Sequence, residues 1–225
     1  MGDQASLEVA AFFDVDGTLT RTTVLHPLVW YQRARLSRLR FLAWFAGLCL
    51  QVPGYILLDR KDRAAFTRRF YHRYRGLDAA DVRRYHEAAL SETVLPRIYP
   101  DAAKQIDWHR SQGHQLILVS GGIDLTLRPL AEHLHAAQLL CVKLAERDGI
   151  LTGELATPPM IQSEKARAMQ NCPGIDLGRS YAYGDSISDA PMLEAVGNPR
   201  AVNPDSRLRR LAESRGWPIL MWNRK

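Results

Sequence analysis

A short apolar run that stops at an acidic turn constrains this chain more than any other feature of its sequence. Residues 9–13, Val-Ala-Ala-Phe-Phe, lead directly into Asp14-Val15-Asp16-Gly17. A β-branched and aromatic run closed by Asp and Gly predicts a buried strand that enters a loop. Side chains two residues apart on an extended backbone point the same way, so we expect Asp14 and Asp16 to face one site. Two carboxylates that lie so close together repel each other unless a cation lies between them or one of them is protonated.

The second half of the chain alternates between strand and helix patterns. Apolar strands are predicted at 115–119, 181–183, 201–202 and 219–220, with helices beginning near Pro100, after Gly122, at Ser163 and at Asp205. Such alternation predicts an α/β protein with a parallel, doubly wound sheet. Residues 139–146 and 150–155 flank Asp148-Gly149, a pair that strongly favours a hairpin turn.

Residues 21–94 carry helical patterns with little strand signal. Residues 33–40 predict a basic helical surface, and residues 60–75 predict a basic amphipathic helix with aromatic residues on one face. Between them, residues 41–58 contain no charge for 18 residues, a length that alone suggests a membrane span. Pro53 is expected to break or kink a helix here. We therefore expect a buried helix pair, with a segment that dips into a membrane interface as the alternative.

Crossing a membrane through residues 41–58 conflicts with the position of the predicted site. A single span would separate Asp14 from Ser120, which follows the predicted strand 115–119 and is expected in the same site, and two spans need about 40 apolar residues. We therefore expect no crossing.

The positive charge of the chain is concentrated in one segment. The net charge is +6, yet residues 21–95 hold 14 arginines and lysines against 6 acidic residues, an excess of 8. Such a surface favours an anionic substrate or peripheral contact with an anionic membrane, whereas no motif accompanies it that would indicate nucleic-acid binding. Three widely spaced cysteines indicate a reducing compartment, and we expect a cytoplasmic protein, with peripheral membrane contact left open.

Polar residues follow the predicted strands where one edge of the sheet would collect them. The carboxyl ends of parallel strands share an edge, so residues far apart in sequence are expected to converge there. Paired carboxylates suit Mg²⁺, whereas a hydroxyl, glycine amides and a lysine suit a phosphate. The set, in chain order, is Asp14, Asp16, Ser120, Gly121, Gly122, Lys165, Asp185 and Asp189.

Four stretches in this order resemble the motifs of haloacid dehalogenase superfamily phosphatases, in the subfamily typified by phosphoserine phosphatase. They are residues 14–18 (Asp-Val-Asp-Gly-Thr), 119–122 (Val-Ser-Gly-Gly), Lys165, and 184–189 (Gly-Asp-Ser-Ile-Ser-Asp). The resemblance covers residues 9 to about 203. It implies a Rossmann-like core formed by residues 1–20 and 95–225, with a helical cap domain inserted at 21–94.

The resemblance also implies catalytic roles. Asp14 would be the nucleophile that takes the phosphoryl group. Asp16 would protonate the leaving oxygen and then deprotonate the hydrolytic water. Ser120 and Lys165 would complete the catalytic set and, with Gly121 and Gly122, hold the phosphoryl oxygens.

The implied cofactor is Mg²⁺. Its ligands would be Asp14, the backbone carbonyl of Asp16, and Asp185, with Asp189 nearby or acting through water. A cation there would let an anionic carboxylate approach an anionic phosphate.

The implied enzyme is a Mg²⁺-dependent phosphomonoester hydrolase that acts through an aspartyl-phosphate on a small anionic phosphometabolite. Phosphoserine is disfavoured, because phosphoserine phosphatases carry a glutamate shortly after the first motif and residues 21–24 (Arg-Thr-Thr-Val) contain no acid. The alternative is a phosphatase of lipid phosphates, such as phosphatidylglycerol phosphate, at a membrane surface. A phosphotransferase and a non-catalytic binding protein remain open but are less favoured.

Overall fold

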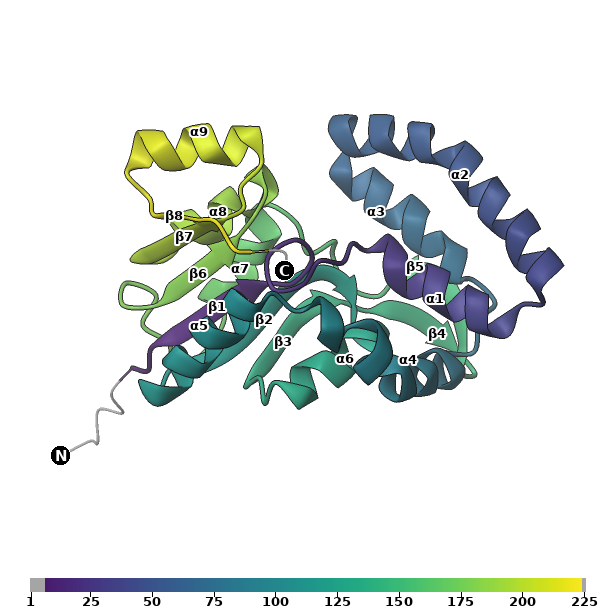
Figure 1. The fold of residues 1–225 in the computed structure, drawn as a ribbon, viewed down its shortest axis with the longest axis horizontal. Helices are drawn as coiled ribbons and strands as arrows, with labels where there is room; N and C mark the ends of the chain where they lie inside the picture. Colours follow the sequence, from purple (N-terminus) through teal and green to yellow (C-terminus); the bar gives the residue numbers. More distant parts are fainter. Residues whose placement is uncertain (1–6, 224–225) are drawn as a thin grey trace.

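The computed structural model describes residues 7–223, so residues 1–6 and 224–225 of the predicted core lie outside the described residues. Figure 1 shows a twisted sheet flanked by helices, with a helical insertion to one side. The strands are β1 Ala10–Asp14, β2 Gln115–Ile123, β3 Gln138–Val142, β4 Leu144–Arg147, β5 Ile150–Leu155, β6 Tyr181–Gly184, β7 Asn198–Val202 and β8 Ile219–Leu220. The α-helices are α1 Leu25–Arg35, α2 Arg38–Lys61, α3 Arg63–Tyr71, α4 Ala79–Thr93, α5 Pro100–Ser111, α6 Asp124–His133, α7 Ser163–Gln170, α8 Ala190–Glu194 and α9 Ser206–Arg215.

Six parallel strands form the central sheet in the order β3-β2-β1-β6-β7-β8. The strand β1 lies inside the sheet, where Asp14 is paired with Val119 of β2 and Phe13 with Tyr183 of β6. All five residues of β1 are buried, as expected for a parallel strand covered on both faces. The predicted α/β class with a parallel sheet core is confirmed.

Alternating side chains of the strands feed two apolar layers. Phe13 stacks on Tyr183 with ring centroids 4.2 Å apart, in the layer that also contains α5 and α6 residues such as Ile106 and Leu130. Phe12 faces the other layer, which receives residues of α7, α8 and α9. Helices therefore cover both faces, and the carboxyl end of β1 is free to enter a loop.

Two predicted strand boundaries are wrong. The strand β2 does not end at Ser120 but continues to Ile123, with a shift of register between Val119 and Ile123. Two glycines permit this irregular stretch, and pairing with β3 resumes at Ile123, so α6 begins only at Asp124.

The predicted strand 139–146 is in fact two strands. Its first part, β3, joins the central sheet, and its second part, β4, pairs with β5. The chain leaves the sheet at Lys143, whose amide donates a hydrogen bond to Thr157 Oγ1 at 2.9 Å. Asp148 and Gly149, with φ of 51° and 77°, form the predicted turn between β4 and β5.

Helices α1 to α4 fill the insertion between β1 and α5, and α2 and α3 project away from the sheet (Figure 1). The two ends of the insertion leave the core side by side. Arg21 N donates to Arg97 O at 2.8 Å, and Tyr99 N donates to Leu19 O at 3.1 Å. The basic stretch 33–40 is not one helix, because α1 ends at Arg35 and α2 begins at Arg38.

The helix α2 contradicts two expectations for residues 41–58, the break at Pro53 and the burial of a helix pair. It runs unbroken for 24 residues through Pro53, and only Leu48 and Tyr55 are buried. Pro53 lies on the exposed side, where a gentle bend can relieve the ring clash and water can reach the freed carbonyl. Within residues 7–223, α2 alone is long and apolar enough to cross a membrane, and 11% of its most apolar window is buried. It is an exposed single helix rather than a buried pair.

Candidate active site

The acidic turn after β1 is closed by its own backbone. Leu19 N donates to Asp14 O at 3.2 Å, and Thr20 N donates to Val15 O at 2.9 Å. Gly17 has φ of +91°, and a Cβ atom at this position would lie 2.3 Å from Asp185 Oδ2. Only glycine lets the turn adopt this conformation and lets the Asp185 carboxylate approach so closely.

Lys165 joins two carboxylates that come from different strands. From the first turn of α7, its Nζ donates to Asp14 Oδ1 at 2.5 Å and to Asp189 Oδ1 at 2.7 Å. The three side chains are 5%, 8% and 2% exposed for Lys165, Asp14 and Asp189. Burial disfavours the ammonium, but the two carboxylates outweigh it and raise the pKa of Lys165 above its usual value. Lys165 is therefore a fixed positive charge at neutral pH.

The loop after β6 holds Asp189 in place. Its Oδ2 accepts hydrogen bonds from Ser186 N at 3.1 Å and Ser186 Oγ at 3.0 Å. Burial opposes ionisation, yet Lys165 and Ser186 keep the pKa of Asp189 below its usual value. Asp189 thus enters the site as a carboxylate.

Three carboxylates meet at this point. Oxygens of Asp14, Asp185 and Asp189 lie within 4.8 Å of one another. Burial, with repulsion from the neighbouring carboxylates, raises the pKa of Asp14 to about 7 and that of Asp185 to about 8, although Lys165 acts in the opposite direction. One lysine does not balance three acids, and carboxylate oxygens are the ligands that Mg²⁺ prefers. The donor set therefore fits a hard divalent cation.

The Asp16 carboxylate has a different partner. Thr22 Oγ1 donates to Asp16 Oδ1 at 2.6 Å, and the Thr20 and Thr22 hydroxyls lie 2.5 Å apart. Burial raises the pKa of Asp16, and the Thr22 hydrogen bond offsets part of this shift. A raised pKa favours the protonated form, which a proton donor to a leaving group requires.

Ser120 lies beside Asp14 because β2 pairs with β1. It directly follows Val119, the partner of Asp14, and its Oγ accepts a hydrogen bond from Gly122 N at 2.9 Å. The Gly121 carbonyl accepts a hydrogen bond from the Tyr71 hydroxyl of α3 at 2.7 Å. The phosphate contacts predicted for Gly121 and Gly122 stay predictions.

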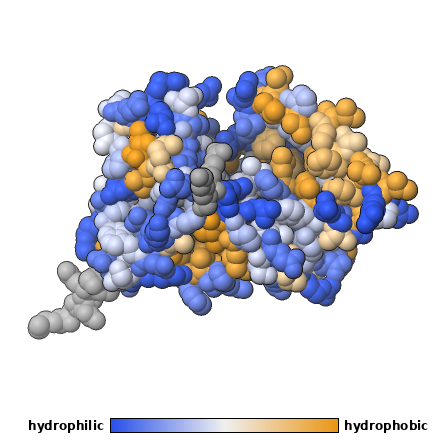
Figure 2. All heavy atoms as spheres, viewed as in Figure 1, coloured by the Kyte–Doolittle hydropathy of each residue, from blue (hydrophilic) through white to orange (hydrophobic). Residues whose placement is uncertain are grey.

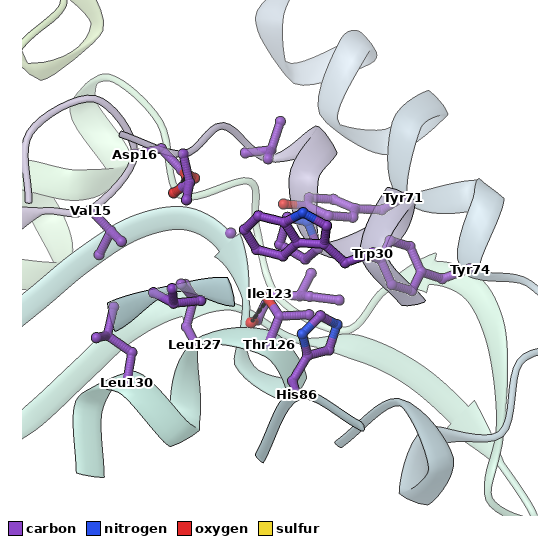
Figure 3. Close-up of a pocket in the computed structure, with 15 residues that line it drawn as sticks. Val15, Asp16, Trp30, Tyr71, Tyr74, His86, Ile123, Thr126, Leu127 and Leu130 are labelled. Atoms are coloured by element: carbon purple, nitrogen blue, oxygen red, sulfur yellow. Dashed lines mark hydrogen bonds between the residues drawn. The ribbon is translucent and has the colours of Figure 1, made fainter. Parts of the chain in front are cut away.

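A cavity of about 20 Å³, room for one water-sized group, lies beside Asp16 (Figure 3). Its polar lining includes Thr22, Thr126 and His86, and no lysine or arginine. His86 is 3% exposed, and its Nε2 has no hydrogen-bond partner among the described residues. Burial lowers the pKa of His86 to about 4, so the ring is neutral at pH 7. The apolar lining is Val15, Val24, Pro27, Trp30, Tyr71, Tyr74, Val94, Ile123, Leu127 and Leu130.

A family model for haloacid dehalogenase-like hydrolases matches residues 11–194 of this sequence. The chain belongs to this family. It is 34% identical over 222 residues to the inhibition of morphological differentiation protein of Streptomyces azureus, covering 96% of this chain and 79% of that protein. It is 31% identical over 220 residues to a phosphoserine phosphatase of Mycobacterium tuberculosis, covering 95% of this chain and 70% of that protein.

Solved structures share the fold of this hydrolase. A Bordetella pertussis Tohama I protein of unknown function superposes with a TM-score of 0.80 at 23% identity, over 95% of this chain and 98% of that one. A substrate-bound phosphoserine phosphatase complex gives a TM-score of 0.71 at 18% identity, over 97% and 94%. The predicted superfamily and the resemblance to its phosphoserine phosphatases are confirmed.

In this haloacid dehalogenase-like hydrolase, the structure gathers most of the predicted site. Asp14, Lys165, Asp185 and Asp189 form one cluster, with Ser120 on the adjacent strand, whereas the Asp16 carboxylate is held by Thr22. The sequence prediction noted that residues 21–24 lack an acid but did not find the role of Thr22. It also missed His86, since a single histidine in a helical pattern gives no signal.

Proposed function

We propose that this hydrolase cleaves phosphate monoesters through a phosphoryl group carried on Asp14. The observation that supports this proposal is the buried contact of Lys165 with Asp14 and Asp189, beside Asp185. A fixed cation and a cluster of carboxylates at the end of β1 are suited to positioning and neutralising a phosphoryl group.

In the proposed first step, an oxygen of Asp14 attacks phosphorus and the bond to the leaving oxygen breaks. Asp16 gives its proton to that oxygen, then accepts a proton from the water that attacks the phosphoryl group and releases phosphate and Asp14. Lys165, Ser120 and the amides of Gly121 and Gly122 would hold the phosphoryl oxygens.

The proposed cofactor is Mg²⁺. Its ligands would be Asp14, Asp185, the backbone carbonyl of Asp16, and Asp189 directly or through water. When bound, the cation supplies positive charge that lets the phosphate dianion approach the acidic cluster.

We further propose that residues 1–20 and 95–225 are the catalytic core and residues 21–94 the cap. The cavity beside Asp16 supports this division, because Trp30, Tyr71 and His86 of the insertion meet Thr126 and Leu130 of the core around it. The leaving oxygen would lie at this boundary between cap and core, next to its proton donor Asp16.

The substrate we propose is a small phosphate ester that is anionic through its phosphoryl group. The cavity is small, and apart from Asp16 it offers no acid for an ammonium group and no lysine or arginine for a carboxylate. Phosphoserine, which carries both, is expected to be a poor substrate. The cap arginines would act at a distance, since Arg68 and Arg69 are exposed and Arg73 donates to Tyr55 and Gln51.

A lipid phosphate is the second candidate substrate, and the exposed apolar surface of α2 favours it. The protein would then act in the cytoplasm at the periphery of a membrane, with the phosphate entering the site and the acyl chains remaining in the bilayer.

The test is a phosphatase screen over phosphorylated metabolites, p-nitrophenyl phosphate and lipid phosphates in mixed micelles, with Mg²⁺ and with EDTA. Activity that requires Mg²⁺ and is absent in Asp14→Asn supports the proposal. Full activity in EDTA contradicts the metal assignment, and phosphoserine as the best substrate contradicts the argument from the cavity. Products analysed with added glycerol distinguish hydrolysis from transfer to an alcohol.

A further inference from the structure

The outer side of α2 carries a continuous apolar stripe. Its members recur at intervals of three and four residues, which places them on one side of a helix. Every member is exposed, and Leu39, Leu50 and Leu57 are 81%, 84% and 72% exposed. Figure 2 shows apolar residues gathered over this part of the molecule, at the upper right. The α2 stripe is Leu39, Leu42, Ala46, Leu50, Pro53 and Leu57.

The fold already uses the opposite side of α2. Leu48 and Tyr55 are buried there, and the Tyr55 ring packs against Phe66 and Phe70 of α3 at centroid distances of 5.8 and 6.4 Å. The packing of α2 on α3 therefore leaves the α2 stripe without a partner in the described part of the chain.

Positive charges stand at both ends of the stripe. Arg38 and Arg40 precede the uncharged stretch 41–58, and Arg60 and Lys61 follow it, about 27 Å further along the helix. All four are exposed, and none takes part in the ion pairs found among residues 7–223. An apolar stripe with basic ends complements acyl chains below anionic headgroups.

We propose that α2 is a docking helix for an anionic lipid surface and lies in the plane of that surface. A second copy of the chain is a poorer partner, because its stripe would bring the same four positive charges against these. The proposal goes beyond hydrolysis, since it concerns a surface outside the site and holds whatever the ester.

The geometry of α3 sets the orientation. The chain returns from the end of α2 through α3, which has nine residues and is therefore about 13 Å long. A hydrocarbon layer of about 30 Å is too thick for this return path, and the exposed Arg68 and Arg69 on α3 oppose burial in it. The α2 helix can thus enter the interface sideways but cannot cross.

This orientation would bring lipid close to the site. The end of α2 and the start of α3 line a cleft through Arg60, Lys61 and Arg63, and the other wall of the cleft includes Ile187 and Ser188. These two residues belong to the 3₁₀ turn that ends at Asp189. A surface bound along α2 would therefore lie beside a cleft that adjoins the loop of the acidic cluster.

The test uses the full-length Asp14→Asn protein, so that the result does not depend on catalysis. Cys49 lies in α2 and is exposed, whereas Cys141 and Cys172 are buried, so an environment-sensitive thiol dye labels α2 selectively. We expect binding to vesicles of phosphatidylglycerol and phosphatidylcholine at least tenfold tighter than to pure phosphatidylcholine, with a blue shift of the dye and weaker binding at 0.5 M salt.

A matched pair of triple variants locates the contact. Leu39→Ser, Leu50→Ser and Leu57→Ser together should weaken vesicle binding at least tenfold with an unchanged circular dichroism spectrum. Leu7→Ser, Ile150→Ser and Met221→Ser, which remove exposed apolar side chains elsewhere, should leave it unchanged.

Three results would overturn the proposal. They are the absence of binding to anionic vesicles at low salt, equal losses in the two triple variants, and a dye shift that follows protein concentration without vesicles. The last result would assign the stripe to a second copy of the chain. Failure of the phosphatase screen with intact vesicle binding would instead count against the proposed function alone.

Discussion

Replacing Lys165 with methionine should destabilise the protein and abolish its activity. Lys165 Nζ contacts Asp14 and Asp189 at 2.5 and 2.7 Å, and all three side chains are at most 8% exposed. Removing one partner of a buried ion pair costs about 3–5 kcal/mol. Because this lysine contacts two carboxylates and Asp185 is near them, we expect the free energy of unfolding to fall by an amount at the upper end of this range, about 5 kcal/mol at pH 8.

The pH dependence of that loss follows from Asp14. Its pKa is raised to about 7 even with Lys165 present, and removing the lysine raises it further. A carboxyl with a raised pKa in the folded state binds its proton more readily there than in the unfolded chain. Its ionisation therefore costs more stability as the pH rises from the unfolded to the folded pKa, and this cost is absent only below the unfolded pKa of about 4. The loss of stability in Lys165→Met should therefore be clearly smaller at pH 5.5 than at pH 8, and Mg²⁺ should restore part of the stability at pH 8.

Urea unfolding followed by circular dichroism, at both pH values and with and without Mg²⁺, measures these changes. Lys104→Met is the control, because Lys104 pairs with Asp101 at 3.1 Å but is 78% exposed. Its replacement should lower the free energy of unfolding by less than about 1 kcal/mol. A Lys165→Met loss no larger than that of the control at pH 8, or hydrolysis of p-nitrophenyl phosphate within tenfold of wild type, would refute the assignment.

Three further changes test other parts of the site. Asp14→Asn should reduce hydrolysis of p-nitrophenyl phosphate at least a thousandfold. It should not lower the thermal stability at pH 8, because it removes one of three carboxylates that repel one another. Activity within a few-fold of wild type would contradict the assignment of Asp14 as the nucleophile. Gly17→Ala should reduce kcat/KM at least a hundredfold and weaken Mg²⁺ binding in calorimetry, since its Cβ would lie 2.3 Å from Asp185 Oδ2, and a twofold effect would contradict this. As the pH falls from 7 to 4.5, the free energy of unfolding measured in urea should decrease by about 2–3 kcal/mol more in wild type than in His86→Phe. The sign follows because the pKa of His86 is lowered to about 4, so the unfolded chain takes up the proton first as the pH falls. Parallel stability curves for the two proteins would rule this out.

The sequence was sufficient for the parts of the site that follow from strand ends. Asp14 ends one short apolar strand and Asp185 directly follows another, and a parallel sheet brings such positions together. Lys165 enters the predicted set because a lysine at the start of a helix suits a phosphate, but only the family resemblance gives it a specific role.

The remaining features depend on tertiary packing. The contact between Thr22 and Asp16 is set by how the chain leaves the turn, and no spacing rule predicts it. The packing around His86 likewise decides whether its buried ring finds a hydrogen-bond partner. The surroundings of Pro53 decide whether this proline interrupts the helix. Residues 41–58 are equally compatible with a core helix and an exposed one, and only the neighbouring helix determines which forms.

The two ends of the insertion are hydrogen-bonded to each other, through Arg21 and Arg97 and through Leu19 and Tyr99. For the folding of the sheet, the whole insertion between these two ends therefore acts as one closed loop. The entropy of closing a loop grows only with the logarithm of its length, by about 0.6 kcal/mol for each doubling. An insertion fastened in this way can lengthen, shorten or be exchanged for another with little effect on the folding of the core. The same acidic cluster of the core can thus be combined with different insertions.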